Sequence, residues 1–294
     1  MAMELLSYGD SLPCGQYYKQ STFEQVINFA PTDGGGDYLA SIVTATVGDG
    51  PLHVMVDHLP DSSQWDWLRV DKNSFVVVSD LEVIVLNKGQ GDCYHSQLDW
   101  PEVELNSTTM LEQRIKLLTT WLALGSQPGG IASLLHSRWR PAMDSFNRAF
   151  YQQLQEGIDY LFSEEWSKGA KMLKGIGPGL TPAGDDFLLG VASASYLMGW
   201  AMGREFLSQR GAEIACLVRS NNLVVDSMAG MVAQGRFTYP VKSLLTELLN
   251  HKSTPEQLKS AYNLVNNFGQ SSGSDFLSGL VLGIERSEQW LSMA

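Results

Sequence analysis

The sequence contains one short pattern twice, and each copy leads into an apolar run. Residues 184–190 read GDDFLLG and residues 273–279 read GSDFLSG, so Gly, Asp, Phe, Leu and Gly align. The runs that follow, VASASYLMGWAMG and LVLGIERSEQWL, have helical character. A glycine-rich loop that opens a helix presents backbone N–H groups and the positive end of the helix dipole. The repeat therefore predicts two related loop–helix units, each suited to binding an anion.

The first copy belongs to a longer loop, Gly177-Pro178-Gly179-Leu180-Thr181-Pro182, which ends at Asp185 and Asp186. Thr181 followed by Pro182 is typical of an N-cap with proline at the first helical position. A capped helix alone would explain the aspartates, because negative charge stabilises a helix N-terminus. A cap needs neither this glycine density nor a second copy, so the repetition favours a functional site.

The repeat also predicts how the two loops are arranged. We expect them to lie close together, each at the start of a buried helix, and to be related by an approximate two-fold axis. Phe187 and Phe276 should be core residues, because each falls in the first turn of a largely apolar helix.

The candidate catalytic residues are the aspartates of the repeat. Asp186 and Asp275 align, and Asp185 is an additional carboxylate in the first copy. Adjacent residues on a helix point about 100° apart, so Asp185 and Asp186 cannot form a tight dyad. We expect one of them to bind substrate or a metal and the other to cap the helix. The candidate substrate-binding residues are Gly177, Gly179, Thr181, Gly184, Gln234, Gln270, Ser271, Ser272, Gly273 and Ser274.

Other kinds of site have less support in the sequence. The five histidines are scattered and absent from both loops, which disfavours a Ser-His-Asp triad or a histidine-ligated zinc site. No cofactor is certain, although Asp185, Asp186 and Asp275 would suit Mg²⁺ as oxygen ligands. The run Gly34-Gly35-Gly36 lacks the Walker lysine, so we interpret it as a hairpin loop and not as a phosphate loop.

Composition bounds the class of protein. A chain of 294 residues that is 44% hydrophobic can form one large or two ordinary domains. A net charge of −12 argues against non-specific binding to nucleic acid or anionic membranes, and no apolar stretch has the length of a membrane span. The first fifteen residues do not resemble a signal peptide, and Cys14, Cys93 and Cys216 show no disulfide or metal-ligand spacing. We expect a cytoplasmic enzyme or enzyme subunit.

The chain changes character near residues 100–108. Before this point, short runs rich in β-branched residues predict strands, at 38–47, 52–56, 75–78 and 82–86. No helical pattern alternates with them, which favours an antiparallel sheet or barrel. After Asn106, helical patterns cover 109–124, 143–166, 185–206, 220–235, 240–250, 255–267 and 274–291. We predict an α+β fold, with a β-rich domain at 1–106 and a mainly α-helical domain at 107–294 that carries both loops.

These motifs resemble the AllH-like subunit family of oxamate carbamoyltransferase, which is associated with anaerobic allantoin breakdown. The resemblance is carried by the loop 177–182 with Asp185-Asp186, by Gly269-Gln270-Ser271-Ser272-Gly273 with Asp275, and by Ala233-Gln234-Gly235-Arg236-Phe237. It covers roughly residues 173–283, and the first third of the chain shows no matching motif. The family often has histidine where this chain has Gln270, which cannot act as an acid–base catalyst.

The resemblance implies a subunit of a multi-protein enzyme in purine catabolism and nitrogen metabolism. The enzyme converts oxalurate and phosphate into oxamate and carbamoyl phosphate. Both substrates are anions, and helix N-termini suit the binding of carboxylate or phosphate and of developing negative charge. The resemblance does not say which subunit holds the chemistry. A non-catalytic partner subunit, and an Mg²⁺-dependent phosphoryl- or acyl-transfer enzyme, therefore remain alternatives.

Overall fold

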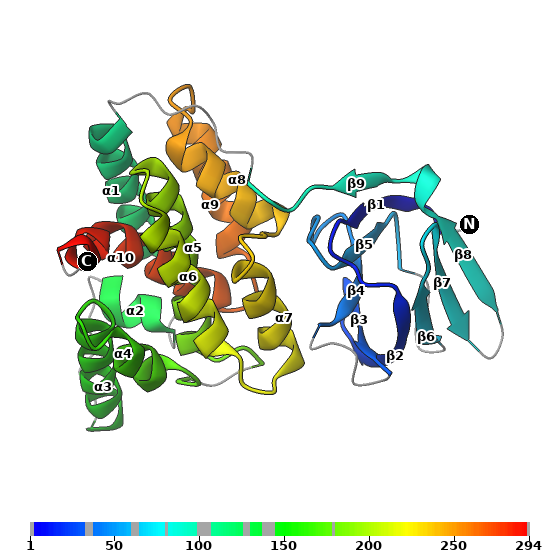
Figure 1. The fold of residues 1–294 in the computed structure, drawn as a ribbon, viewed down its shortest axis with the longest axis horizontal. Helices are drawn as coiled ribbons and strands as arrows, with labels where there is room; N and C mark the ends of the chain where they lie inside the picture. Colours follow the sequence, from blue (N-terminus) through cyan, green and yellow to red (C-terminus); the bar gives the residue numbers. More distant parts are fainter. Residues whose placement is uncertain are drawn as a thin grey trace. The chain divides into compact units, whose positions relative to one another are not determined.

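The computed structural model describes residues 3–32, 38–59, 65–79, 82–98, 107–125, 130–136, 145–177 and 180–292. Its contacts divide the chain into two compact units, Met1–Leu98 with Arg236–Lys242, and Asp99–Gly235 with Ser243–Ala294. The N-terminal part is β-rich and the rest is mainly helical, as the sequence predicted (Figure 1). The predicted boundary at residue 106 and the glycines at 34–36 lie outside the described ranges, so both stay predictions.

The β-rich unit contains one sheet of nine strands in the spatial order β8-β7-β6-β2-β3-β4-β5-β1-β9. The strands are β1 (Leu5–Gly9), β2 (Gly15–Thr22), β3 (Val26–Pro31), β4 (Ala40–Thr44), β5 (His53–Val56), β6 (Trp65–Val70), β7 (Ser74–Ser79), β8 (Val83–Asn87) and β9 (Asp92–Tyr94). A short 3₁₀ helix, η2 (Lys88–Gln90), lies between β8 and β9. The strand-like runs of the sequence correspond to β4, β5, β7 and β8.

The sheet is mixed, which corrects the expectation of a purely antiparallel one. Among the described strands, β4 pairs with β5 and β1 pairs with β9 in parallel, and the other pairings are antiparallel. The chain returns from β4 to the start of β5 through residues 45–52, where Gly48 has a φ of 84°. The sequence between these two strands is short and contains no helical pattern. Such a connection is typical of antiparallel strands, because parallel strands usually need a longer crossover.

Alternation of side chains gives the part of the sheet around β2 and β6 one buried face. Tyr17, Leu68 and Val77 lie in register on β2, β6 and β7, and all three are buried. Their neighbours Tyr18 and Trp67 also face each other across β2 and β6, but both are exposed. Removing the buried side chains from water is the main stabilising contribution, at roughly 25 cal/mol per Å² of apolar surface. The unit therefore has its own hydrophobic core.

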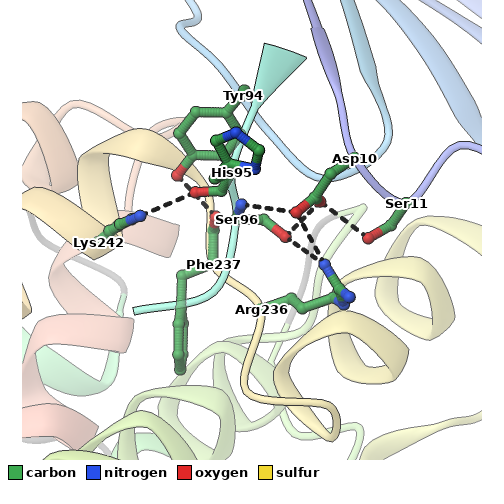
Figure 2. A network of polar contacts seen from close by, with 8 residues as sticks. All are labelled: Asp10, Ser11, Tyr94, His95, Ser96, Arg236, Phe237 and Lys242. Carbon is green, nitrogen blue, oxygen red and sulfur yellow. Dashed lines mark hydrogen bonds and ion pairs between the residues drawn. The ribbon is translucent and has the colours of Figure 1, made fainter. Parts of the chain in front are cut away.

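The segment Arg236–Lys242 belongs to this β-rich unit although it is distant in sequence. Figure 2 shows the polar contacts that hold it. Arg236 Nη1 lies 3.0 Å from Asp10 Oδ2 and donates to Ser96 Oγ at 3.0 Å. The Tyr94 hydroxyl donates to the carbonyl of Phe237 at 2.9 Å. Burial alone would raise the pKa of Asp10, but hydrogen bonds from Ser96 and the charge of Arg236 lower it overall.

Ten α-helices are present in the described residues. They are α1 (Ser107–Gly125), α2 (Ile131–His136), α3 (Ser145–Leu161), α4 (Trp166–Leu173), α5 (Ala183–Ala201), α6 (Glu205–Val218), α7 (Leu223–Val232), α8 (Tyr239–Leu249), α9 (Pro255–Asn266) and α10 (Ser272–Leu291). Helices α2, α4 and α6 were not predicted as separate elements, and the predicted patterns at 143–166 and 185–206 extend beyond α3 and α5. None of the helices in the described chain combines the length and hydropathy of a membrane span.

Helix α5 is buried along most of its length and packs against α10, α6, α7, α4 and α2. It meets α10 very closely, through the aligned glycines of the repeat. A Cβ atom at Gly190 would lie 2.0 Å from the carbonyl oxygen of Phe276, and one at Gly279 would lie 1.9 Å from that of Phe187. Phe187 and Phe276 are 0% and 6% exposed, which confirms that both are core residues. The two helices thus contact each other reciprocally through equivalent residues.

We predict that Gly190→Ala and Gly279→Ala each lower the free energy of unfolding by about 1–3 kcal/mol, because the added methyl group forces the helices apart. Gly125→Ala is the matched control. A Cβ atom there has no neighbour within 4 Å, so helix propensity alone acts and the change stays within about 1 kcal/mol. Urea unfolding of the three variants measures the effect. Equal stability of all three would contradict the close crossing of α5 and α10.

Candidate functional site

The two loops of the repeat contact each other through side-chain hydroxyl groups. Thr181 Oγ1, in the α4–α5 loop, lies 2.9 Å from Ser272 Oγ at the start of α10. Thr181 Oγ1 also donates to Asp186 Oδ2 at 3.0 Å. Thr181 and Ser272 are half-buried, whereas Asp186 is only 3% exposed. These contacts confirm that the loops lie close together. At their junction, the carboxyl group of Asp186 is buried, and the hydroxyl groups of Thr181 and Ser272 are more accessible.

The predicted N-cap role of Thr181 is wrong. Helix α5 begins at Ala183, and Pro182 occupies the cap position without a side-chain hydrogen bond. The Thr181 hydroxyl is instead hydrogen-bonded to Asp186 and Ser272. The sequence pattern of a capped helix cannot show this, because the competing partner Ser272 comes from a distant segment.

The adjacent aspartates point to different partners, as the helical geometry predicted. Asp185 Oδ1 accepts a hydrogen bond of 2.8 Å from the backbone N–H of Gly175, which ties the loop back to the start of α5. Asp186 instead faces Thr181. Asp185 therefore holds the loop, and Asp186 is the aspartate of this pair that contacts the hydroxyl groups.

Asp275 contacts a third helix. Its Oδ1 accepts a hydrogen bond of 3.1 Å from the backbone N–H of Ala132, in the first turn of α2. The side chain of Asp275 is fully buried, and its Oδ2 has no hydrogen-bond partner among the described residues. The same is true of Asp185 Oδ2. Burying a charged carboxylate oxygen without a hydrogen bond costs free energy, so the neutral carboxylic acid is favoured at both residues.

Burial changes the protonation of all three carboxyl groups. It raises the pKa of Asp186 from its ordinary value of 3.8 to about 8, although hydrogen bonds from Ser272 and Thr181 act in the opposite direction. The nearby charges of Asp275 and Asp185 add a smaller rise. Burial raises the pKa of Asp275 to about 6 despite hydrogen bonds from α2 and from Ser271, and it also raises the pKa of Asp185. Asp186 is therefore mainly protonated at neutral pH and can donate a hydrogen bond.

Several backbone N–H groups expected to bind an anion already have partners within the chain. Gly184 donates to the carbonyl of Ile176 at 2.8 Å, and Gly273 donates to that of Phe268 at 3.0 Å. The N–H groups of Asp185 and Asp275 are also bonded within their own loops. These four N–H groups are thus not free to bind a ligand at this junction, whereas the hydroxyl groups of Thr181 and Ser272 are half-buried and accessible.

The other candidate residues divide into those near the hydroxyl pair and those away from it. Ser271 and Ser274 are at the start of α10, where Ser274 Oγ donates to the carbonyl of Ser271 at 2.8 Å. Gln270 is exposed in the same loop. Gly177, with a φ of 100°, lies in the first loop, and Gly179 lies outside the described residues.

Gln234 is not brought to the loops. Its side chain donates to the carbonyl of Gly230 at the C-terminal end of α7, and its neighbour Ala233 accepts from the Tyr196 hydroxyl on α5. Tyr196 is ten residues beyond Asp186, a separation of about 15 Å along the helix axis. The Ala-Gln-Gly segment of the sequence therefore lies at the other end of α5.

Sequence reasoning missed the residues that brace the first loop from α7. Asn222 caps α7 and also donates through Nδ2 to the carbonyl of Leu180 at 2.7 Å. Asp226, buried in the same helix, accepts hydrogen bonds from the backbone of Ser220 and Asn221. An Asn that precedes an apolar run is a recognisable N-cap, but its bond to a distant loop has no sequence signal.

The proposed magnesium ligands do not converge. Within the described ranges, no group of three or more His, Cys, Asp or Glu side chains is arranged to hold a metal ion. Asp185 and Asp275 each direct one oxygen to a backbone N–H group, of Gly175 and of Ala132. The geometry of the described residues thus does not fit the expected Mg²⁺ site.

The comparisons bear on this same region. The family model described as oxamate carbamoyltransferase subunit AllH matches residues 173–284. That stretch begins at the last residue of α4 and ends within α10, so it contains both loops. The resemblance that the motifs predicted is confirmed over these residues. The chain matches no curated protein and no solved structure.

We predict that Asp186 makes the protein less stable as pH rises. Its folded pKa of about 8 exceeds the ordinary 3.8, so the folded state holds the proton between these values. The contribution of this proton to the free energy of unfolding is fully present below about pH 4. It is lost as pH rises through about 8, and the free energy of unfolding falls by up to about 1.4 kcal/mol for each pH unit. Thermal unfolding of Asp186→Asn between pH 5 and 9 should show a flatter dependence than the wild type.

Asp226→Asn is the control for this measurement. It removes a buried carboxylate that bonds backbone N–H groups, yet leaves Asp186 in place, so it should lower the melting temperature while keeping the wild-type pH slope. An Asp186→Asn variant with the wild-type slope would show that Asp186 does not hold the proton.

Proposed function

We propose that this chain is a subunit of a carbamoyltransferase complex of the oxamate type, which converts oxalurate and phosphate into oxamate and carbamoyl phosphate. A small anionic substrate binds where the loop before α5 meets the loop before α10. The match of residues 173–284 to the AllH subunit family supports this proposal, because it contains both loops.

The two loops and their helices are copies of one unit in this proposal, related by an approximate two-fold axis. The reciprocal contacts of Gly190 and Gly279 support it. The first glycines of the copies support it as well. A Cβ atom at Gly184 would lie 1.8 Å from a carbonyl oxygen in the last turn of α4, and one at Gly273 would lie 2.1 Å from one near the end of α9. Each unit is thus a helix, a tight loop and a second helix.

The hydroxyl contact between the loops is the observation that carries the site. Thr181 and Ser272 come from different copies and meet at 2.9 Å beside the buried carboxyl group of Asp186. Hydroxyl groups bind carboxylate or phosphate oxygen as hydrogen-bond donors. Ser272 is the group we assign to contact the substrate, and Asp186 acts through the hydroxyls.

Asp185 and Asp275 have a positioning role in this proposal. Asp185 fixes the first loop through Gly175, and Asp275 fixes α2 through Ala132. Gln270, which replaces a histidine common in the family, is exposed in the second loop. Acid–base chemistry at the junction therefore depends on Asp186 and not on residue 270.

We place the protein in the cytoplasm, where it works with partner subunits. The three cysteines are unpaired and exposed, as expected in a reducing compartment. The proposal includes other subunits of the complex and a small anion, but no nucleic acid and no membrane. A scaffold subunit without chemistry is the second candidate, favoured by the aspartates Asp185, Asp226 and Asp275, each of which accepts a hydrogen bond from the backbone of a loop or helix start.

We predict that Asp186→Asn and Ser272→Ala each lower the turnover of the reconstituted complex about 100-fold, and that neither variant melts at a lower temperature than the wild type at the assay pH. General acid–base catalysis, the role of Asp186, typically contributes about 10²–10⁴-fold, and one hydrogen-bond donor to a developing oxyanion, the role of Ser272, contributes about 10²–10³-fold. Steady-state carbamoyl transfer with all subunits present measures this effect. Asp275→Asn should instead lower stability by about 1 kcal/mol, because it removes a capping carboxylate.

Asp226→Asn is the matched control, because this carboxylate lies on α7 and bonds the backbone of Ser220 and Asn221. It should cost stability and leave turnover unchanged. Full turnover of Asp186→Asn and Ser272→Ala, in a complex that still requires this chain, would reject the site and favour the scaffold candidate.

A further inference from the structure

Strand β8 forms one edge of the nine-stranded sheet, and in the described part of the chain it pairs with β7 alone (Figure 1). Its residues, VIVLN, include no charge and no proline, and its register with β7 is not interrupted by a bulge. Val83 and Val85 are 62% and 52% exposed. Natural sheets usually protect an edge strand with charge, proline or a bulge, because its unpaired backbone groups bind other strands. Strand β8 therefore has the properties of a strand that pairs with another chain.

The opposite edge of the sheet is protected in two ways. Strand β9 has only three residues and contains a charged side chain, Asp92. Beyond it, Gln97 forms a β-bridge with Arg236, and the N–H of Phe237 donates to the carbonyl of Ser96 at 2.9 Å. Among the described strands, β8 is therefore the edge that remains available for pairing.

Two hydrogen bonds at the ends of β8 show which of its backbone groups face the free edge. Ser79 N–H donates to the carbonyl of Glu82 at 3.0 Å, and Lys88 N–H donates to the carbonyl of Asn73 at 2.9 Å. Both ends of β8 thus bond to β7, and in an antiparallel ladder every second residue between them does the same. The backbone groups that point away from β7 belong to residues 83, 85 and 87.

A second copy of β8 fits this edge. When two copies run antiparallel about a two-fold axis at Val85, residue 85 lies opposite its own copy and residue 83 lies opposite residue 87. These are the residues whose backbone groups face the edge, so each of them donates and accepts a hydrogen bond across the pairing. A shift by one residue would place groups that face the edge opposite groups that face β7, and the hydrogen bonds would be lost.

The charges at the two ends of β8 are complementary in the same register. Glu82 precedes the strand and Lys88 follows it, so each lies opposite the other on the second copy. Neither side chain takes part in the ion pairs of the described residues. Opposite charges directly across an antiparallel pair are stabilising, and like charges are destabilising. A shift by two residues would keep the backbone hydrogen bonding but would place these charges opposite Leu86 or Ile84.

We propose that β8 is a dimerisation edge, which binds β8 of a second copy of this chain in antiparallel register about a two-fold axis at Val85. The pairing joins two nine-stranded sheets into one continuous sheet. It is isologous, so it closes with two copies and does not form a filament. Two paired five-residue strands are smaller than a standard interface, so we expect a roughly micromolar dissociation constant for the isolated chain. This inference does not depend on the function proposed for the two loops.

Cysteine cross-linking tests the register directly. The exposed residues Cys14, Cys93 and Cys216 are first replaced by serine. In that background, Val85→Cys should form an interchain disulfide with its own copy under mild oxidation, because directly opposed residues have Cα atoms about 5.5 Å apart. Val83→Cys is the matched control. It is the more exposed position, but its copy lies about 14 Å away along the strands, beyond the reach of a disulfide.

Charge reversal gives a second measurement that needs no cysteine. Glu82→Lys should weaken dimerisation about tenfold, because attractive contacts at both ends of the pairing become repulsive. Lys88→Glu should do the same, and the double variant should restore wild-type association. Lys88→Glu also removes the contact of Lys88 Nζ with the ring of Phe75, 4.8 Å from its centroid, but Glu82→Lys cannot restore that contact. Sedimentation equilibrium over about a hundredfold range of concentration around the micromolar measures the dimer.

A wild-type chain that stays monomeric over this range would overturn the inference, as would equal cross-linking of Val83→Cys and Val85→Cys. A double variant that dimerises no better than Glu82→Lys alone would also overturn it. Cross-linking of Val85→Cys to another subunit of the reconstituted complex, instead of to its own copy, would assign the edge to that subunit and reject self-pairing. Turnover of the complex is measured separately, so failure of the dimer leaves the proposed function standing.

Discussion

The close crossing of α5 and α10 is the constraint on which the helical unit depends. Gly190 and Gly279 lack the Cβ atoms that would collide with backbone carbonyl oxygens at 2.0 and 1.9 Å. Each glycine lies six residues after the glycine that opens its helix. A short backbone separation at the crossing therefore also brings the two helix starts close together, and Thr181 comes within hydrogen-bond distance of Ser272.

The aspartates show how one residue type takes different roles within the same helical unit. Asp185, Asp226 and Asp275 each accept hydrogen bonds from the backbone of a neighbouring loop or helix start. Asp186 faces hydroxyl groups instead and is one residue further along α5 than Asp185. The rotation of about 100° per residue separates the aspartate that holds the loop from the one that faces Ser272.

Much of the fold follows from local pattern. The β-rich N-terminal part and the helices at 109–124, 240–250, 255–267 and 274–291 correspond closely to the structure. Strands such as β2 (GQYYKQST) were missed, because a strand with one solvated face mixes polar and apolar residues. The parallel pairing of β4 with β5 was also missed, since pairing is a non-local property.

The sequence by itself determined that two glycine- and aspartate-containing segments are alike, that Phe187 and Phe276 are core residues, and that Asp185 and Asp186 diverge. These conclusions depend on helical geometry and hydrophobic periodicity, which are local. Only the tertiary structure decided that Thr181 bonds Ser272 instead of capping α5, that Asp275 bonds α2, and that Gln234 lies away from the loops. Each of these depends on a partner from a distant segment, and the packing of the helices selects that partner.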